Sequence, residues 1–397
     1  MIPNNRSTEL TKIARKFFDS KTTFLNNAKD ITVHKNKQII LSYFHASEED
    51  WNSWKWQIKN SIHTTEKLNE IFNLHLCIIS KNYWAITPYF LSLIQEFNYS
   101  DPIFAQMIPN SLEKDDTWGT PDPMNEEITQ PVQRLTRRYP DRVTINVTNS
   151  CFSYCRHCQR KRNISCHVNT ITSNEFKNAL HYIREHQEIR DVIITGGDPL
   201  ILSNQELEII IQSIRDIPHV EIIRIGTRAL STMPQRISKD LSIMLQKYSP
   251  IYINTQFDHP NEITVDTERA CSVLSDHGIV LGNQSVLLKG VNDNSFTLQL
   301  LNQILLKNRI RPYYIFHPKT VKGTHHFYVS IDRGVEIVNQ LRGNTSGLCI
   351  PTYIYNSPGG NGKIVLNKNS LIQKNGNKFV VTWEGKKIQV LDDNELK

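Results

Sequence analysis

The segment Arg142-Val-Thr-Ile-Asn-Val-Thr-Asn-Ser-Cys-Phe-Ser-Tyr-Cys-Arg-His-Cys158 contains the two patterns that decide the fold. Its first half, Val143–Val147, is rich in β-branched residues and predicts a β-strand. Its second half places Cys151, Cys155 and Cys158 in one short loop directly after that strand. Three thiolates with this CxxxCxxC spacing can bind three irons of a [4Fe–4S] cluster and leave the fourth iron open to a ligand. The segment therefore predicts a metal centre at the carboxyl end of a strand.

Strand-like runs recur along the chain and alternate with amphipathic helical stretches. The strand candidates are Val143–Val147, Val192–Thr195, Ile222–Ile225, Ile251–Gln256, Ile279–Leu287 and Tyr313–His317. The helical candidates between them include Asn174–His186, Gln205–Ile214 and Leu298–Leu306. Such alternation implies parallel strands joined by right-handed crossovers. Six of these units predict an α/β fold built on a partial (β/α)6 barrel.

Two flanking regions complete the predicted organisation. Residues 1–130 read as a helical N-terminal extension, in which Asp101–Asn125 reads as an extended connector because it is rich in Pro, Asp and Asn. Residues 131–345 form the predicted barrel. Residues 346–397 form a small C-terminal segment, whose tail predicts a hairpin around Asn375-Gly376.

Composition narrows the classes of protein that this chain can belong to. It has 397 residues and a formal net charge of +7, but Lys and Arg are scattered rather than gathered in one stripe, so we expect no nucleic-acid partner. No apolar run is long enough to cross a bilayer and the N-terminus lacks a secretory signal, which predicts a cytoplasmic protein without a membrane partner. The four other cysteines, at positions 77, 166, 271 and 349, are isolated and predicted to be inert buried thiols.

Polar motifs follow most of the predicted strands. After the cysteine loop come Gly196-Gly197-Asp198, Thr227-Arg228, Asp258-His259 and Lys319, each at the end of a strand candidate. The carboxyl ends of parallel strands lie at one face of a barrel, and that face carries the active site in such folds. The motifs are therefore expected to meet in one site.

The cysteine loop has an alternative interpretation, a zinc site with His157 or His167 as its fourth ligand. Structural zinc ligands usually come as two separated pairs, which is not the pattern of this loop. The glycines of Gly196-Gly197-Asp198 would let the backbone approach a ligand closely. Together the loop and the glycines resemble the radical SAM enzymes. That resemblance implies that the open iron binds S-adenosylmethionine (SAM) and that Gly-Gly-Asp contacts its methionyl amino group.

Longer segments resemble the lysine 2,3-aminomutase family of radical SAM enzymes. They are Trp54–Gln57, Leu135–Arg142, the cysteine loop, Gly196–Leu200, Ile225–Arg228, His259–Thr264, Gly282–Asp293, Arg311–Tyr314, Leu341–Gly347 and Pro358–Lys363. The resemblance implies that Lys363, at the end of a Gly-rich, flexible turn, binds pyridoxal 5′-phosphate (PLP) covalently. It also implies that Arg138 and Arg142 hold the PLP phosphate, that Gln284 is a cofactor-binding residue, and that Arg160 pairs with the substrate α-carboxylate.

The resemblance further implies a reaction and its partners. A 5′-deoxyadenosyl radical would take a hydrogen from C3 of an amino acid, and the amino group would migrate from C2 to C3. The small-molecule substrate would be joined by an external one-electron reductant, similar to flavodoxin or ferredoxin. Members of the family imply a homo-oligomer, a dimer or a tetramer.

Two positions depart from the lysine-specific members of the family. There, two aspartates hold the distal ammonium of lysine, whereas this chain has Lys319 and Asn356 at the matching positions. Lys319 would repel an ammonium and pair with a carboxylate, and Asn356 could donate a hydrogen bond to that carboxylate. The pair resembles that of glutamate 2,3-aminomutases, which convert L-glutamate to β-glutamate. Lysine, aspartate, glutamine or a carrier-linked amino acid remain alternatives, as does a Lys319 that points to solvent.

Two further expectations concern metal and class. Asn294 follows Val291-Asn292-Asp293 where lysine-specific members have a zinc-binding cysteine, and the tail has no cysteine, so we expect no structural zinc. The alternative from another class is a non-catalytic iron–sulfur protein that contacts RNA. That function would need an arginine-rich face with aromatic platforms, which the sequence does not display.

Overall fold

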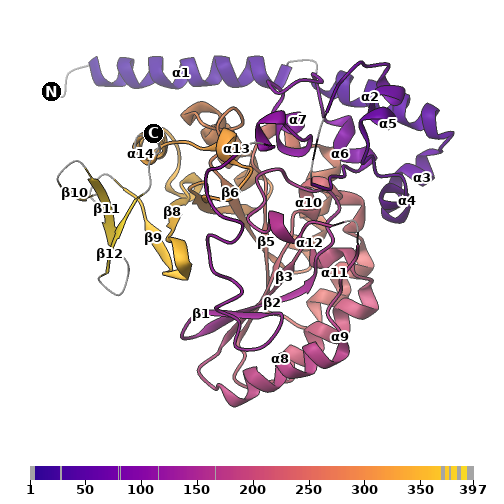
Figure 1. Ribbon diagram of the computed structural model, residues 1–397. Coiled ribbons are helices and arrows are strands. Elements are labelled where there is room, and N and C mark those ends of the chain that lie inside the picture. The colour runs from indigo at the N-terminus through magenta and orange to yellow at the C-terminus, as the bar shows by residue number, and fades with distance from the viewer. Residues whose placement is uncertain are drawn as a thin grey trace.

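The computed structural model describes residues 5–26, 29–78, 80, 82–114, 116–165, 167–367, 372–374, 377–381 and 386–390. Its centre is a nine-stranded sheet (Figure 1). The strands are β1 (Leu135–Tyr139), β2 (Arg142–Thr148), β3 (Asp191–Gly196), β4 (Ile222–Gly226), β5 (Ile251–Thr255), β6 (Val280–Val286), β7 (Ile310–Phe316), β8 (Thr352–Asn356) and β9 (Lys363–Val365). They follow one another across the sheet in chain order. Strands β2 to β8 pair in parallel, and β1 and β9 pair antiparallel at the two edges.

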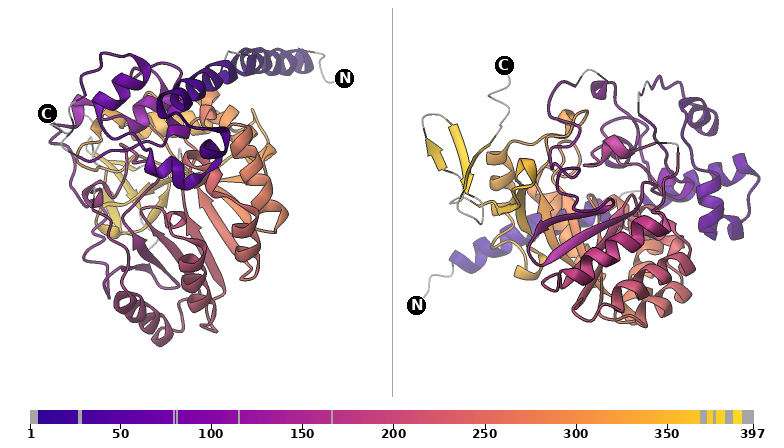
Figure 2. Two further views of the ribbon diagram at one scale, coloured as in Figure 1. Left: turned by 90° about the vertical axis from the view of Figure 1, so that its right-hand side faces the viewer. Right: turned by 60° about the horizontal axis from the view of Figure 1, so that its bottom comes forward.

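Helices cover the outer side of the curved sheet, as two further views show (Figure 2). They are α8 (Ser173–Glu185), α9 (Asn204–Arg215), α10 (Ala229–Thr232), α11 (Lys239–Gln246), α12 (Val265–Asp276), α13 (Ser295–Lys307) and α14 (Ile331–Asn339). Short 3-10 turns occur at Ser111–Glu113, Lys161–Asn163, Pro199–Ile201, Pro234–Arg236, Pro260–Glu262, His325–Phe327, Gly347–Cys349 and Pro358–Gly360. The curved sheet with its outer helices is the partial barrel that the strand–helix alternation predicts, and all six predicted strands are present as β2 to β7.

The pattern of apolar residues explains why the sheet and its helices pack together. In α9, Leu207, Ile210, Ile211 and Ile214 recur at helical spacing and are all buried against the sheet. In β2, alternate residues from Val143 to Val147 face the helices, which leaves the side chains between them on the inner face. Burying each such aliphatic side chain stabilises the fold by about 1.5–3 kcal/mol. The inner face is therefore free to carry the polar residues of a site.

The N-terminal region is helical and has a core of its own. It comprises α1 (Asn5–Asn26), α2 (Lys29–Phe44), α3 (Glu48–Asn52), α4 (Trp54–Lys59), α5 (Thr65–Phe72), α6 (Pro88–Ser92) and α7 (Pro102–Met107), and α1 runs along the upper edge of the molecule in Figure 1. The prediction of an extended connector over Asp101–Asn125 is wrong at its start, because α7 lies there. Asp101 caps the helix by accepting hydrogen bonds from the backbone of Ile103 and Phe104, and Pro102 takes the first helical position.

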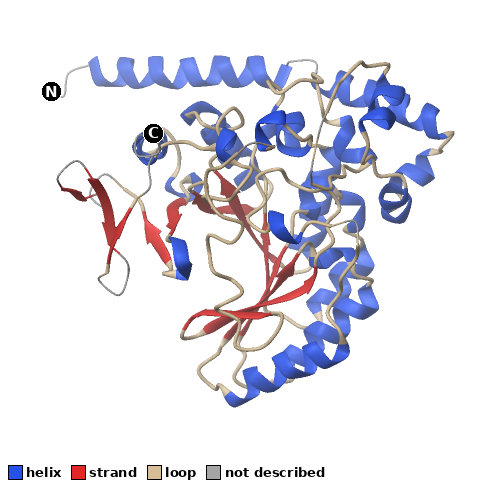
Figure 3. Cartoon of the chain, viewed as in Figure 1, coloured by secondary structure: helices blue, strands red, loops and turns tan. Residues whose placement is uncertain are grey.

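The C-terminal residues add an antiparallel hairpin and a small sheet (Figure 3). Strand β9 pairs with β8, and a separate three-stranded sheet contains β10 (Ile372–Lys374), β11 (Asn377–Val381) and β12 (Lys387–Gln389). The predicted tail hairpin corresponds to β10 and β11, whose turn residues Asn375 and Gly376 lie outside the described residues.

Two sequence-based expectations about single features have definite outcomes. Cys271 and Cys349 are buried as predicted, whereas Cys77 is exposed, so the prediction of a buried thiol is wrong there. Cys166 lies outside the described residues. Within the described ranges, no helix combines the length and the apolar character needed to cross a bilayer.

Candidate active site

A cavity of about 530 Å³ opens at the carboxyl ends of the parallel strands. The last residue of each strand from β2 to β7 lines it: Thr148, Gly196, Gly226, Thr255, Val286 and Phe316. The lining also includes the cysteine loop, Gly197, Asp198, Arg228, Gln284 and Lys319. The polar motifs that follow β2, β3, β4 and β7 therefore meet in one place, as barrel topology predicts, whereas Asp258 and His259 after β5 are not among the lining residues.

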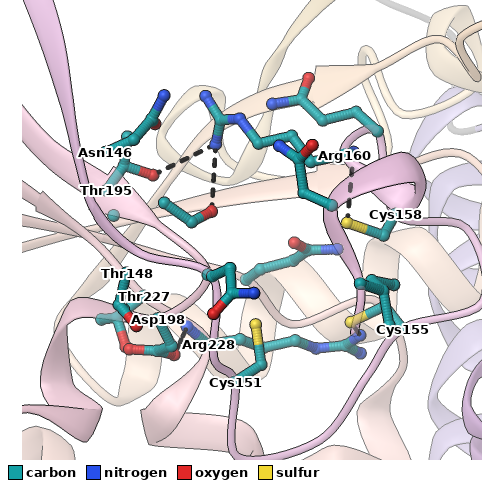
Figure 4. A pocket seen from close by; sticks show the side chains of 18 of the residues that line it. Asn146, Thr148, Cys151, Cys155, Cys158, Arg160, Thr195, Asp198, Thr227 and Arg228 are labelled. Carbon is teal, nitrogen blue, oxygen red and sulfur yellow. Dashed lines mark hydrogen bonds between the residues drawn. The ribbon is translucent and has the colours of Figure 1, made fainter. Parts of the chain in front are cut away.

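The cysteine loop presents its three thiols to this cavity. Figure 4 shows Cys151, Cys155 and Cys158 along one side of the pocket, on the loop that leaves β2. The loop is held by the N-terminal region, because the amide of Tyr154 donates to the carbonyl of Ala85 and that of Arg156 donates to the carbonyl of Gln106. The buried guanidinium of Arg156 also forms hydrogen bonds of 3.0 and 2.6 Å with the carboxylate of Glu113.

The donors around the thiols suit sulfur ligands of an iron cluster. Nη1 of Arg228 donates to Sγ of Cys155 over 2.8 Å, and the amide of Arg160 donates to Sγ of Cys158 over 3.3 Å. Burial raises the pKa of the Cys155 thiol to about 11, against the opposing effect of Arg228. Metal binding deprotonates such thiols, and N–H donors then stabilise the bound thiolates. The residues present therefore fit a cluster.

The zinc alternative finds no support in the position of His157. Its Nε2 lies 3.0 Å from the side-chain nitrogen of Gln256 and 3.5 Å from a carboxylate oxygen of Asp258. Burial, with the nearby charge of Arg228, keeps the pKa of His157 well below its ordinary value.

Arg228 is at the centre of a buried charge network under the cysteine loop. Its Nη2 donates to Oε1 of Gln106 over 2.6 Å and lies 3.2 Å from Glu262 and 3.4 Å from Asp258. Burial raises the pKa of Asp258 to about 6, although Arg228 opposes that change. Sequence reasoning placed Thr227-Arg228 at a strand end but gave Arg228 no partner.

The two glycines at the end of β3, Gly196 and Gly197, allow this strand end to touch the cysteine loop. Gly196 has φ of 133°, and a Cβ on Gly197 would lie 2.2 Å from the carbonyl oxygen of Ser150. The amide of Gly197 donates to the carbonyl of Thr148, and that of Asp198 donates to the carbonyl of Ser150. Since these amides are engaged, the segment offers a ligand its carbonyl oxygens, which suit an amino group.

The side chain of Asp198 ties two strand ends together. Its carboxylate accepts hydrogen bonds from Oγ1 of Thr227 at 2.7 and 2.8 Å and from the amide of Arg228 at 2.8 Å. These bonds fix the loop after β4 against the loop after β3. The carboxylate thus positions the cavity wall around the cysteine loop.

Glu126 lies among three arginines and was not identified from the sequence. Its carboxylate accepts hydrogen bonds of 2.9 Å each from Nε and Nη2 of Arg160, and lies 3.3 Å from both Arg138 and Arg162. Burial alone would raise the pKa of Glu126, but the arginines, Arg160 foremost, lower it to about 2. Arg160 uses its remaining nitrogen, Nη1, to donate to the carbonyl of Gly196 over 3.3 Å.

Lys363 lies beside two tyrosine rings and several arginines. It is the first residue of β9 and directly follows the Gly-rich turn, in which Gly359, Gly360 and Gly362 have positive φ. Its amide donates to Oη of Tyr139 over 2.9 Å, and its Nζ lies 5.3 Å from the ring centre of Tyr139 and 5.8 Å from that of Tyr314. Burial, reinforced by Arg142, Arg224 and Arg138, lowers the pKa of Lys363 to about 8.

The surroundings of Lys363 fit a phosphate-bearing aldehyde. Nε of Arg138 is buried without a hydrogen-bond partner among the described residues, which is unusual for a guanidinium and leaves a donor for an anion, whereas its Nη2 lies 3.3 Å from Glu126. The guanidinium of Arg142 stacks 3.9 Å above the ring centre of Tyr139. A lysine with a lowered pKa is the group that attacks a carbonyl at neutral pH. The residues therefore fit PLP.

Lys319 and Asn356 lie at a second, smaller cavity next to the first. Both line a space of about 10 Å³, and Lys319 lines the main cavity as well. Nζ of Lys319 donates to the side-chain oxygen of Gln159, so this lysine does not point to solvent. Nδ2 of Asn356 is buried without a hydrogen-bond partner in the described part of the chain. Burial, then Arg138, lowers the pKa of Lys319 to about 7.

Comparison with known proteins identifies the family to which this chain is similar. The Radical SAM superfamily model matches residues 145–298, and the Lysine-2,3-aminomutase model matches residues 338–390. A glutamate 2,3-aminomutase from Clostridioides difficile (strain 630) is 48% identical over 374 residues, which are 92% of this chain and 88% of that protein. The chain belongs to the lysine 2,3-aminomutase family of radical SAM enzymes. It is thus an isomerase of the aminomutase type.

Members that act on lysine are nearly as similar. An L-lysine 2,3-aminomutase from Acetoanaerobium sticklandii is 44% identical over 353 residues, which are 86% of this chain and 85% of that protein. Another, from Clostridium subterminale, is 43% identical over 350 residues, which are 86% of this chain and 84% of that protein. Membership of the radical SAM family implies a [4Fe–4S] cluster, SAM and an external reductant. It leaves the substrate to be argued from the site.

The structure brings most of the predicted residues of this aminomutase together in two neighbouring groups. The three cysteines, Gly196, Gly197, Asp198, Gln284, Arg160 and Lys319 line the main cavity. Arg138, Arg142 and Lys363 form the second group around Tyr139, and Asn356 is the register partner of Lys363 across the β8–β9 hairpin. Glu126, Tyr139, Gln159 and Arg228 complete these groups, and only their contacts across the fold reveal them.

Proposed function

We propose that this chain is a glutamate 2,3-aminomutase, which converts L-glutamate to β-glutamate. The observation that carries the proposal is the position of Lys319. Its ammonium reaches the main cavity, and its hydrogen-bond partner among the described residues is a neutral amide, that of Gln159. A cation with such a partner attracts a substrate carboxylate and repels a substrate ammonium.

The size of the electrostatic effect favours glutamate over lysine. Two like charges roughly 4 Å apart repel by about 4 kcal/mol at the effective dielectric constant of about 20 that suits protein sites. Lysine would bring its distal ammonium against Lys319, whereas glutamate would bring an attractive carboxylate. The buried and unpartnered Nδ2 of Asn356 adds a donor that a carboxylate can use. The 48% identity to a glutamate 2,3-aminomutase supports the same substrate.

The other residues of the site have distinct proposed roles. Cys151, Cys155 and Cys158 bind the cluster, and Gly196 and Gly197 offer carbonyl oxygens to the amino group of SAM. Gln284 lines the same cavity from β6 and is proposed to contact a cofactor there. Arg160 holds the α-carboxylate of the substrate, and Glu126 keeps the guanidinium of Arg160 in place through two hydrogen bonds. With each carboxylate at its own cation, the substrate spans the cavity and exposes C3.

Lys363 is the proposed attachment point of PLP, with Arg138 and Arg142 as phosphate ligands. When bound, SAM at the cluster supplies a carbon radical and PLP supplies a carbonyl that holds the substrate amino group. The net reaction moves the amino group from C2 to C3 and one hydrogen from C3 to C2, so atoms balance without a further reactant. The pKa of Lys363, lowered to about 8, keeps a useful fraction of its amine neutral near pH 7.

A substrate panel tests the proposal. Protein reconstituted anaerobically with iron, sulfide, PLP and SAM is reduced with dithionite and incubated with L-glutamate, L-lysine, L-glutamine or L-aspartate in separate reactions. The products are separated and identified by mass spectrometry. We expect β-glutamate as the main product and little turnover of lysine. Preferred conversion of L-lysine would refute the substrate and favour the alternative, a lysine 2,3-aminomutase.

A double variant tests the pocket itself. Lys319→Asp with Asn356→Asp replaces one positive charge and one amide by two carboxylates. We expect this variant to lose glutamate turnover and gain activity on lysine. If neither activity changes, then other residues read the side chain.

A further inference from the structure

Gln159 lies in the cavity wall between two residues that the proposed function uses. Its neighbours in the chain are Cys158 and Arg160, and all three line the main cavity. The side-chain oxygen of Gln159 accepts a hydrogen bond from Nζ of Lys319, which lies 160 positions later. One turn of the cysteine loop thus contains Arg160, the proposed ligand of the α-carboxylate, and contacts Lys319, the proposed ligand of the distal carboxylate.

The chemistry of this contact leaves Lys319 available to a substrate. An ammonium has three N–H donors, so one bond to Gln159 leaves two for another acceptor. A neutral amide fixes the direction of the ammonium but cannot cancel its charge, as a carboxylate would. The charge of Glu126 does act on Lys319, but both oxygens of that carboxylate already accept hydrogen bonds from Arg160.

We propose that Gln159 is a specificity-determining residue, which orients the Lys319 ammonium toward the distal carboxylate of the substrate and leaves its charge uncompensated. This inference rests on the proposed function, because it needs a substrate with a distal carboxylate. It goes beyond that function because it assigns the choice of substrate to three side chains, Gln159, Lys319 and Asn356, instead of two.

The placement of Gln159 also links the two ends of the substrate. Because residues 159 and 160 are consecutive, any shift of this turn moves the α-carboxylate ligand and the orienting amide together. A substrate that carries one carboxylate at Arg160 and one at Lys319 therefore binds to two cations that this one turn positions. An amino acid with a neutral side chain loses the second ion pair, although it keeps the first.

The test compares two changes at Gln159 with a matched change elsewhere. Gln159→Glu places a carboxylate beside Lys319, whereas Gln159→Leu removes the acceptor without adding charge. Gln205→Glu adds the same charge to an exposed glutamine in α9, which is not among the residues that line the cavity. Values of kcat and KM for L-glutamate are measured for each protein, together with iron content and the absorbance change that L-glutamate causes in PLP-loaded protein without SAM.

The expected result is a graded rise in KM. For Gln159→Glu we expect KM to rise about tenfold or more, because the new carboxylate occupies Lys319 and repels the substrate, while kcat stays within about threefold. For Gln159→Leu the rise is smaller, about threefold, because the charge of Lys319 remains. Iron content in all variants, and the KM of Gln205→Glu, should match the wild type. The absorbance titration without SAM should show the same order of affinities.

Several outcomes overturn the inference, and each has a separate meaning. If the wild type converts L-glutamate but KM of Gln159→Glu stays within twofold of it, this inference fails and the proposed function stands. The inference also fails if kcat and iron content fall together while KM is constant, since Gln159 would then only support the loop. A wild type that converts L-lysine and not L-glutamate overturns the proposed function and this inference together.

Discussion

Glu126→Gln is the substitution whose effect follows most directly from the contacts in the site. The wild-type carboxylate is 5% exposed and accepts two hydrogen bonds of 2.9 Å from Arg160, with Arg138 and Arg162 at 3.3 Å. Glutamine has the same shape but no charge, and its amide nitrogen would face guanidinium donors. The substitution therefore removes the anion on which three buried or half-buried cations converge.

Two independent lines give a similar magnitude. Breaking a buried ion pair by neutralising one partner costs about 3–5 kcal/mol of folding free energy. The pKa of Glu126 is lowered from an ordinary 4.5 to about 2, and such a shift corresponds to about 3 kcal/mol of stability at pH 7. We therefore expect the variant to be about 3 kcal/mol less stable than the wild type at pH 7.

The pH dependence has a definite sign. A carboxyl with a lowered pKa in the folded state stabilises the fold fully above its unfolded-state pKa and loses that effect as the pH falls toward the folded-state value. For Glu126 the window runs from 4.5 down to about 2. The difference between the wild type and Glu126→Gln should therefore shrink to less than half between pH 7 and pH 3, because glutamine does not titrate.

Equilibrium urea unfolding, followed by far-ultraviolet circular dichroism at several pH values, measures both effects. The matched control is Glu127→Gln, whose side chain is 75% exposed and lies 3.4 Å from Arg162. Since exposed ion pairs contribute about 0–1 kcal/mol, that control should behave as the wild type does. The reasoning is refuted if Glu126→Gln lies within 1 kcal/mol of the wild type at pH 7, or if its deficit does not change at low pH.

Three further predictions concern Lys319, Gly197 and Arg228. The apparent KM for L-glutamate should stay constant below pH 7 and rise by up to tenfold per pH unit above it, because only the protonated Lys319, with its pKa of about 7, pairs with a carboxylate. Lys319→Arg should abolish that rise. A flat wild-type profile would contradict the prediction. Gly197→Ala should unfold more easily in urea and retain less iron after reconstitution, since its Cβ would lie 2.2 Å from the carbonyl oxygen of Ser150, whereas Gly347→Ala, with no atom within 4 Å of its Cβ, should change stability by no more than about 0.5 kcal/mol. Arg228→Met leaves Asp258 and Glu262 buried without their cation and should cost about 3–5 kcal/mol by urea unfolding; adding Glu262→Gln should restore part of that loss, and no restoration would argue against the network.

The sequence predicts the barrel because its signals are local. β-Branched residues recur at strand spacing, and amphipathic helices such as Leu207–Ile214 lie between them, so each predicted strand from β2 to β7 appears near its expected bounds. The meeting of strand-end motifs follows from the same topology. Strand β8 and its hairpin with β9 extend the sheet beyond the six predicted strands, within the small C-terminal segment 346–397.

The residues that sequence reasoning missed act through long-range contacts. Glu126 lies 34 positions before Arg160, in a stretch whose polar composition is typical of solvent-exposed connectors, yet it is buried. Gln159 and Lys319 are 160 positions apart, and Arg228 and Cys155 are 73 apart. No periodicity in a single sequence encodes such pairs. A carboxylate within a Pro-rich stretch next to an arginine-rich strand is the one local signal that pointed toward Glu126.

The pairing of Asn356 with Lys363 has a consequence for how new members of this family can arise. The two residues are register partners across one short hairpin, so the side chain proposed to read the substrate and the side chain proposed to hold the cofactor would be inherited as a unit. Recombination that exchanges the β8–β9 hairpin between two relatives would transfer half of the substrate preference without disturbing cofactor attachment. Lys319, which follows β7, would have to change separately. A hybrid with an acidic residue at one of positions 319 and 356 and the present residue at the other would favour neither substrate. Such an inactive intermediate would separate the two specificities.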